Sequence, residues 1–162
     1  MSSKVKSFFL YFLVFIIIFL IDRVSKIYVI NLASTSGVVD IQINNYLNIF
    51  LIWNTGIGFG LFSSGNSIFY NVITFLILII NLIIIYLIYT SDNLKRLIFI
   101  VILGGSSGNL FDRAYYSAVP DFIDLNYNGY HWFIFNFADI FISIGIFCLI
   151  FMEIFNYKNK LS

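Results

Sequence analysis

The sequence carries little charge. Only 10% of its 162 residues are Asp, Glu, Lys or Arg, and the formal net charge is +1, whereas soluble domains carry about 25% charged residues. Hydrophobic residues make up 60% of the chain. This composition excludes an ordinary soluble domain and indicates a single integral membrane domain over residues 1–162. A net charge so close to zero gives no reason to expect a nucleic-acid partner.

Cysteine, histidine and proline are also scarce, with one residue of each. The single Cys148 excludes an internal disulfide, and its apolar surroundings indicate a packing or lipid-facing role. The single His131 lies beside Trp132, which is typical of a membrane interface. The sequence has no HExxH, Walker A or CxxC motif, so we expect no metal ion and no cofactor.

Long apolar runs dominate what is present. Four of them are long enough to cross a hydrocarbon core of about 30 Å as helices. We predict transmembrane helices over about 8–30, 68–89, 94–114 and 139–155. The predicted fold class is therefore an all-α membrane protein with four transmembrane helices and the small outer β-sheet described below.

The basic residues are unevenly distributed along these spans. Four crossings place both termini on one side, and that side holds most of the basic residues: Lys4, Lys6, Lys95, Arg96, Lys158 and Lys160. The positive-inside rule then places both termini in the cytoplasm. The opposite side holds most of the acidic residues: Asp22, Asp40, Asp112, Asp121, Asp124 and Asp139. We therefore expect any chemistry at the extracytoplasmic face.

Two segments between the spans lie on that outer face. In the first, about residues 31–65, we expect no helix. Residues 38–43 and 46–53 are β-prone and flank a turn signal at Asn44-Asn45, which predicts a small sheet lying on the membrane surface. The second segment, about residues 115–138, is polar and aromatic, and we interpret it as an outer loop.

Asp121 and Asp139 are the strongest candidates for chemistry. Charge near a bilayer is costly, and four of the eight acidic residues fall between Asp112 and Asp139. Two carboxylates held close together share one proton, because both cannot ionise cheaply. Such a pair suits peptide hydrolysis, in which one carboxylate activates water and the other protonates the carbonyl oxygen. The alternative is that these aspartates cap helices and pair with Arg113.

Other polar residues near the same face have both structural and functional interpretations. Asn54, Asn109 and Asn136 are candidates to hold a substrate backbone or to orient the carboxylates, but plain hydrogen bonding within the bundle explains them equally well. The adjacent Asp112 and Arg113 are expected to form a buried pair at the end of the third span. Asp22 and Lys26 lie four residues apart, in the favourable order for an ion pair on a helix.

Two alternatives to an aspartic peptidase stay open. Residues 104–108 match the G-x-S-x-G pattern of serine hydrolases, so Ser106 or Ser107 is a candidate nucleophile if His131 or Lys26 supplies the base. Helix packing through small residues explains the same motif. A non-enzymatic, proton-coupled carrier is the other alternative, but relay acids are expected near mid-membrane rather than at the helix ends.

Five motifs in their order along the chain resemble the signature boxes of lipoprotein signal peptidase, also called signal peptidase II. They are DRVSK at 22–26, NTGIGFG at 54–60, GGSSGNLFDR at 104–113, VPDFI at 119–123 and FNFAD at 135–139. Their order and spacing, the chain length and the four-span layout all fit that family.

The resemblance implies an aspartic endopeptidase of the bacterial cytoplasmic (inner) membrane. Its substrates are prolipoproteins carrying a diacylglyceryl group, which it cuts before the lipidated cysteine on the outer side. The implied partners are these prolipoproteins, membrane lipid and the cyclic peptide inhibitor globomycin, and we expect a monomer. The family fold has four helices, an outer β-cradle and a loop.

The resemblance also assigns expected roles by motif position. The catalytic residues are Asp121 and Asp139. The residues expected to contact substrate or inhibitor are Asn54, Asn109, Arg113 and Asn136. The residues expected to support the site are Asp22, Lys26, Gly56, Gly104, Gly108 and Asp112.

Overall fold

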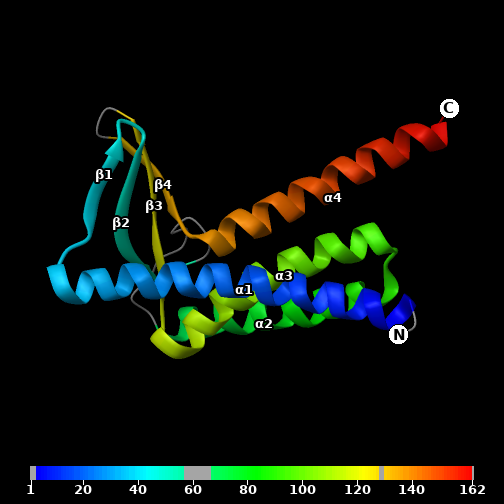
Figure 1. Cartoon of the computed structure of the whole chain (residues 1–162), viewed down its shortest axis with the longest axis horizontal. Coiled ribbons are helices and arrows are strands. Elements are labelled where there is room, and N and C mark those ends of the chain that lie inside the picture. The colour runs from blue at the N-terminus through cyan, green and yellow to red at the C-terminus, as the bar shows by residue number, and fades with distance from the viewer. Residues whose placement is uncertain (1–2, 57–66, 128–129, 162) are drawn as a thin grey trace.

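The computed structural model describes residues 3–56, 67–127 and 130–161. Within these ranges the helices are α1 (Ser3–Ser36), α2 (Ser67–Thr90), α3 (Asn93–Tyr116) and α4 (Phe137–Leu161). The strands are β1 (Asp40–Asn44), β2 (Leu47–Asn54), β3 (Val119–Tyr127) and β4 (Tyr130–Phe135). Figure 1 shows the sheet at one end of the helices and both chain termini at the opposite end.

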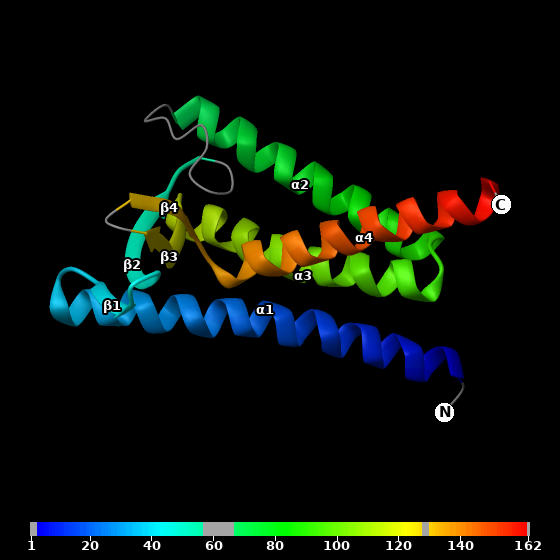
Figure 2. The ribbon, with the colours of Figure 1, turned by 90° about the horizontal axis from the view of Figure 1, so that it is seen from above.

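All four helices are long and apolar enough to cross a membrane, which confirms the predicted number of spans. Helix α3 is central: it packs against α1, α2 and α4, with α1 and α2 on opposite sides of it (Figure 2). A buried cluster centred on Ile84, Ile98 and Ile102 joins α2 and α3 and is extended by side chains of α4. Many large apolar side chains, such as Phe75 at 61% exposure, point outward as lipid-facing residues do.

The sheet has the order β1-β2-β3-β4, and every neighbouring pair is antiparallel. The central pair joins the two outer segments of the chain, with Asn48 opposite Asp124 and Ile52 opposite Asp121. A register shift between Ile49 and Ile52 interrupts this pairing. A small core that includes Val29 and Phe122 attaches the sheet to α1. The sheet therefore fixes β3, and Asp121 with it, against the ends of the helices.

The first helix is longer than predicted. We expected it to end near residue 30 and a non-helical segment to follow, but α1 continues to Ser36. The polar residues of its last turns fit a helix because their hydroxyls bond to carbonyls one turn back, as Ser34 Oγ does to Asn31 at 2.7 Å. Gly37, with φ of 80°, then ends the helix. The two predicted strands follow in β1 and β2, and residues 57–65 of the predicted outer region lie outside the described residues.

The second outer segment is a β-hairpin and not the predicted loop. Strands β3 and β4 occupy most of residues 119–135, and residues 128–129 between them lie outside the described residues. The prediction was wrong because the polar residues of this segment suggested a solvated loop. In the structure their side chains have partners in the sheet and the bundle, as Asp124 has in Asn48 and His131.

Candidate active site

Asp139 lies in the first turn of α4 and forms part of its cap. The Asn136 side-chain oxygen accepts a hydrogen bond from the Asp139 backbone N–H at 3.1 Å, and Asp139 Oδ2 accepts one from the Asn136 backbone N–H at 3.3 Å. This reciprocal arrangement is a capping box, which satisfies two N–H groups that have no partner inside the helix. The cap fixes the rotamer of Asp139 and leaves its Oδ1 for Asn109, which donates to it at 2.8 Å.

Asn136 also joins Asp139 to Asp121. Its side-chain nitrogen donates to Asp121 Oδ1 at 2.6 Å, while Asn54 donates to Asp121 Oδ2 at 2.8 Å. The oxygen of each amide is already occupied by a backbone N–H, of Asp139 for Asn136 and of Gly56 for Asn54. Each amide is therefore held with its nitrogen toward the carboxyl group. Asp121 and Asp139, which we call the acid pair, therefore both accept a hydrogen bond from Asn136, from its side chain and from its backbone N–H respectively.

The acid pair is buried, and no cation of the described residues contacts it directly. Asp121 is 0% exposed and Asp139 is 8% exposed, and neither forms an ion pair within the described residues. Burial, followed by the negative charge of Asp139, raises the pKa of the Asp121 carboxyl from 3.8 to about 7. Asp121 can therefore hold a proton near neutral pH, as a general acid in peptide hydrolysis must.

A second group of buried charges is connected to the acid pair by the side chain of Asn109. It comprises Asp22, Arg23 and Lys26 of α1 and Asp112 of α3, and we call it the ion cluster. Lys26 Nζ lies 2.9 Å from Asp22 Oδ1 and 2.7 Å from Asp112 Oδ2, and Arg23 bonds to both carboxylates. Two cations balance two anions, so the cluster is neutral as a whole.

Two contacts connect the ion cluster to the acid pair. Lys26 donates to the side-chain oxygen of Asn109 at 2.8 Å, which orients the Asn109 nitrogen toward Asp139. Asp22 Oδ1 accepts a hydrogen bond at 3.1 Å from the backbone N–H of Ala138, in the first turn of α4. The ion cluster therefore positions the acid pair through Asn109 and the start of α4.

Glycines allow this close approach of the helices. A Cβ on Gly108 would collide with the Asp22 carboxylate, and one on Gly105 would lie 2.6 Å from the Ala138 carbonyl oxygen. A Cβ on Gly104 would crowd Ile18 at 2.9 Å. The small residues of the predicted motif thus let α3 contact both α1 and α4 at the level of the site.

Arg113 lies beside the site, but its predicted pairing with Asp112 is wrong. Asp112 pairs with Arg23 and Lys26 instead, because neighbouring residues on a helix point in different directions. Arg113 donates from Nη2 to the backbone carbonyl of Gly56. The arginine therefore binds the segment after β2, next to Asn54.

The predicted ion pair between Asp22 and Lys26 is present. The structure does not bring a base to Ser106: its hydroxyl donates to the buried Asn81 of α2 at 2.5 Å. Lys26 is occupied by Asp22, Asp112 and Asn109, and His131 binds Asp124 in the sheet. These contacts favour the packing interpretation of the serine motif.

Sequence reasoning missed three groups near the site. Arg23 belongs to the ion cluster, and its place inside the DRVSK motif was the available signal. The backbone N–H of Ala138 left no sequence signal, because it depends on how α1 meets α4. Tyr70 of α2 contacts Arg113, and nothing in its apolar surroundings marks it. Among the described residues, no group of three or more His, Cys, Asp or Glu side chains is arranged to hold a metal ion.

Comparison with known proteins gives one family over most of the chain. Residues 14–155 match the family model for signal peptidase (SPase) II. The lipoprotein signal peptidase of Pelagibacter ubique (strain HTCC1062) is 51% identical over 97% of this chain and 94% of its own length. That of Anaplasma phagocytophilum (strain HZ) is 37% identical over 85% of this chain and 87% of its own.

Solved structures give the same result for the fold. One described as a bacterial membrane enzyme superposes with a TM-score of 0.75 and 29% identity, covering 93% of this chain and 90% of its own. Another of the same description gives a TM-score of 0.69 and 31% identity over 88% and 91% of the two chains.

Proposed function

Since the chain belongs to the signal peptidase II family, we propose that it is an aspartic endopeptidase that removes signal peptides from diacylglyceryl-modified prolipoproteins. Family membership makes it a bacterial membrane protease. The proposed cut lies before the lipidated cysteine. One observation carries the aspartic mechanism: two buried carboxyl groups both accept a hydrogen bond from Asn136 and lack a directly paired cation among the residues that the structure describes.

The first step of the proposed reaction forms a tetrahedral intermediate. Asp139 is the ionised base, because two N–H donors and the positive end of α4 stabilise its carboxylate. It takes a proton from a water molecule, whose oxygen attacks the scissile carbonyl carbon. Asp121 holds the other proton and gives it to the carbonyl oxygen, so the intermediate carries two hydroxyl groups and no net charge.

The second step breaks the C–N bond. Asp139 returns its proton to the leaving nitrogen, and Asp121 recovers a proton from one hydroxyl of the intermediate. The products are a carboxylic acid and an amine, and both aspartates regain their starting protonation. The side chains of Asn54 and Asn136 keep their orientation through both steps, because the oxygen of each accepts a hydrogen bond from a backbone N–H.

The surroundings of the acid pair suit a lipid-linked substrate. An apolar hollow of about 630 Å³ lies between α1 and the sheet, and its lining includes Val24, Val29, Phe122 and Phe137. Phe122 follows Asp121 directly in the chain. Acyl chains in this hollow would anchor the substrate, and the binding energy would position the scissile bond. We further propose that both termini are cytoplasmic and that the acid pair faces the extracytoplasmic side.

The test is cleavage of a diacylglyceryl-modified prolipoprotein in detergent, with the product masses identifying the bond that is cut. We expect wild-type enzyme to cut before the lipidated cysteine and to be inhibited by globomycin. Asp139→Asn should lose at least about 1,000-fold in kcat, because it removes the base.

Ser106→Ala/Ser107→Ala is the matched control for the alternative mechanism. Under the aspartic mechanism this double variant keeps activity within about tenfold of wild type, since it alters only helix packing. Loss of all activity in the folded serine variant, with Asp139→Asn still active, contradicts the proposal and supports a serine nucleophile.

A further inference from the structure

Arg113 holds hydrogen-bond donors that have no acceptor among the described residues. Its side chain is only 4% exposed, yet Nε and Nη1 are buried without a hydrogen-bond partner in that part of the chain. Buried donors of a charged group are almost always satisfied, so an exception requires an explanation. A ligand that supplies an acceptor is one such explanation.

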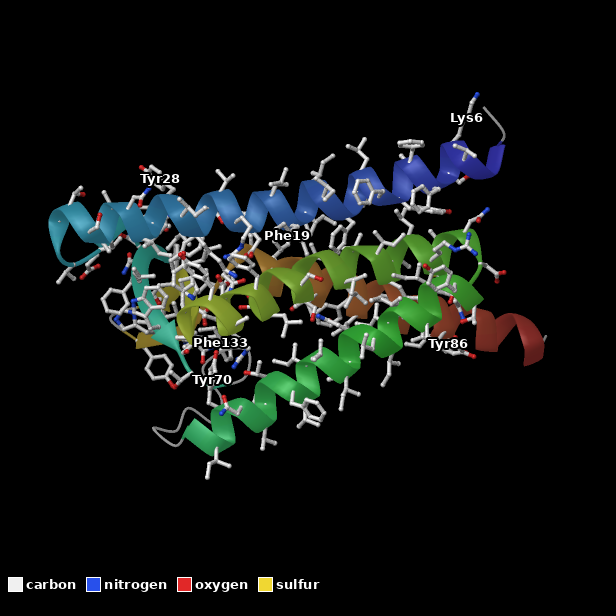
Figure 3. The ribbon with its side chains drawn as sticks, turned by 90° about the horizontal axis from the view of Figure 1, so that it is seen from below. Lys6, Phe19, Tyr28, Tyr70, Tyr86 and Phe133 are labelled. Carbon is white, nitrogen blue, oxygen red and sulfur yellow. The ribbon has the colours of Figure 1, made fainter. Side chains whose placement is uncertain are left out.

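Tyr70 holds Arg113 in place by two contacts. Its hydroxyl donates to the Arg113 backbone carbonyl at 3.0 Å, and its ring lies 5.4 Å from the guanidinium carbon. Figure 3 shows Tyr70 at the sheet end of α2, whereas Tyr86 lies toward the other end of that helix. The carbonyl belongs to the last turn of α3, where helix carbonyls lack partners within the helix.

The contact with an aromatic ring has a particular consequence. A ring face stabilises the positive charge without accepting an N–H bond in the guanidinium plane. A carboxylate in the same place would stabilise the charge but would also occupy the donors. Tyr70 therefore restrains Arg113, and among the described residues the Nε and Nη1 donors have no hydrogen-bond acceptor.

The available donors lie next to the acid pair. Arg113 Nη2 donates to the backbone carbonyl of Gly56. The backbone N–H of Gly56 donates to the side-chain oxygen of Asn54, and the Asn54 side-chain nitrogen donates to Asp121. The carboxyl groups of Asp121 and Asp139 are both close enough to Arg113 to interact with it electrostatically. An acceptor bound to Arg113 is therefore adjacent to the bond that the acid pair would cut.

We propose that Tyr70 is a positioning residue that presents Arg113 Nε and Nη1 to a backbone carbonyl of the bound peptide, next to the scissile bond. This inference rests on the proposed function. A guanidinium group presents several N–H donors in one plane, and an extended peptide has backbone carbonyls that no helix hydrogen bond satisfies. Because the contact forms when the peptide binds, it contributes to the ground state and the transition state alike. Its loss raises KM and leaves kcat near the wild-type value.

The experiment compares Tyr70→Leu and Tyr70→Phe with the control Tyr86→Leu. Tyr86 is on the same helix and is 66% exposed, so its variant removes the same ring without touching Arg113. We expect Tyr70→Leu to raise KM about tenfold, Tyr70→Phe to raise it about two- to threefold, and Tyr86→Leu to leave it unchanged, because a cation–π contact and one hydrogen bond contribute differences of this order. All three variants should retain kcat within about twofold of wild type.

A binding measurement separates this inference from the proposed function. Binding of the lipidated peptide is measured in the Asp139→Asn background with and without Tyr70→Leu, and the same comparison is repeated after adding Arg113→Lys. Tyr70→Leu should weaken binding about tenfold when the arginine is present and have little effect in the Arg113→Lys background, since the two residues act through one contact. An unchanged KM and affinity in Tyr70→Leu, or equal losses with arginine and lysine, overturn the inference even if wild type cuts the substrate. Failure of wild type to cut the lipidated substrate overturns the proposed function instead.

Discussion

The ion cluster and the acid pair each bury two aspartates, but among the described residues only the ion cluster buries cations against them. Asp22 and Asp112 are both 0% exposed, and Arg23 and Lys26 bind them directly. Asp121 and Asp139 are buried to a similar degree and receive neutral N–H donors. Similar burial therefore has different consequences in the two groups: the compensated carboxylates bind cations that tie helices together, whereas burial without a directly bound cation raises the pKa of Asp121.

The two groups also differ in how they are tied to the fold. The ion cluster spans α1 and α3 and reaches α4 through the Ala138 N–H. The acid pair comes from β3 and α4, and its orientation depends on Asn54, Asn109 and Asn136. Changing a member of the ion cluster should cost stability first, and changing a member of the acid pair should cost activity first.

The largest expected effect on stability comes from breaking the compensation in the ion cluster. Asp112→Asn leaves two buried cations against one anion, which should destabilise the protein by about 3–5 kcal/mol. Thermal melting in detergent measures the loss. The control is Lys95→Ala, which removes a pair with Glu153 at 3.4 Å whose side chains are 36% and 74% exposed; its melting temperature should stay close to that of wild type. Equal melting temperatures for the two variants would show that the ion cluster does not hold the helices together.

A smaller effect is expected from replacing the titratable carboxyl group of Asp121. The raised pKa of Asp121, about 7 in place of 3.8, means that the folded protein binds this proton more tightly than the unfolded chain does. Its stabilising contribution is complete below pH about 4 and is lost as the pH rises through about 7. Asp121→Asn cannot titrate, so its free energy of unfolding relative to wild type should rise by on the order of 1–3 kcal/mol between pH 5 and pH 8. A constant difference between the two proteins over this range contradicts the raised pKa.

The smallest expected effect is on the pH profile of cleavage. With Asp121 as the acid, kcat/KM should fall about tenfold per pH unit once its proton is lost. The hydrogen bond from Asn54 opposes the raised pKa, so Asn54→Ala should raise the pKa and move this alkaline limb to higher pH. The measurement is kcat/KM from about pH 5 to 9 for both enzymes. A shift to lower pH would mean that Asn54 favours the protonated form of Asp121.

The sequence predicted the parts of this comparison that depend on local pattern. Apolar runs predicted four spans, and β-prone segments around Asn44-Asn45 predicted the first two strands. The acidic residues near the outer face pointed to Asp121 and Asp139, and the ordered motifs led to the family, which implied roles for these two and for the three asparagines. The structure brings these residues together, and their catalytic and binding roles stay predictions for the experiments above.

The rest depended on how distant segments meet. Asp112 pairs with Arg23, which is 89 positions away, and not with its neighbour Arg113, because α1 packs against α3 where Asp112 lies. The hairpin of β3 and β4 escaped prediction because buried polar side chains made a strand resemble a loop. The partnership of Tyr70 with Arg113 likewise depends on the contact of α2 with the end of α3. Tertiary packing determines these pairings, and no local periodicity records it.

The cap of α4 has a consequence for inhibitors. The Asn136 side chain both caps the start of α4, through its oxygen, and binds Asp121, through its nitrogen, while Asp139 accepts the reciprocal bond of the cap. A substitution of Asn136 that weakens the binding of a compound there would also remove the cap at the start of α4 and the hydrogen bond to Asp121. A compound that makes its main contacts with this turn would therefore meet a target with few viable resistance mutations.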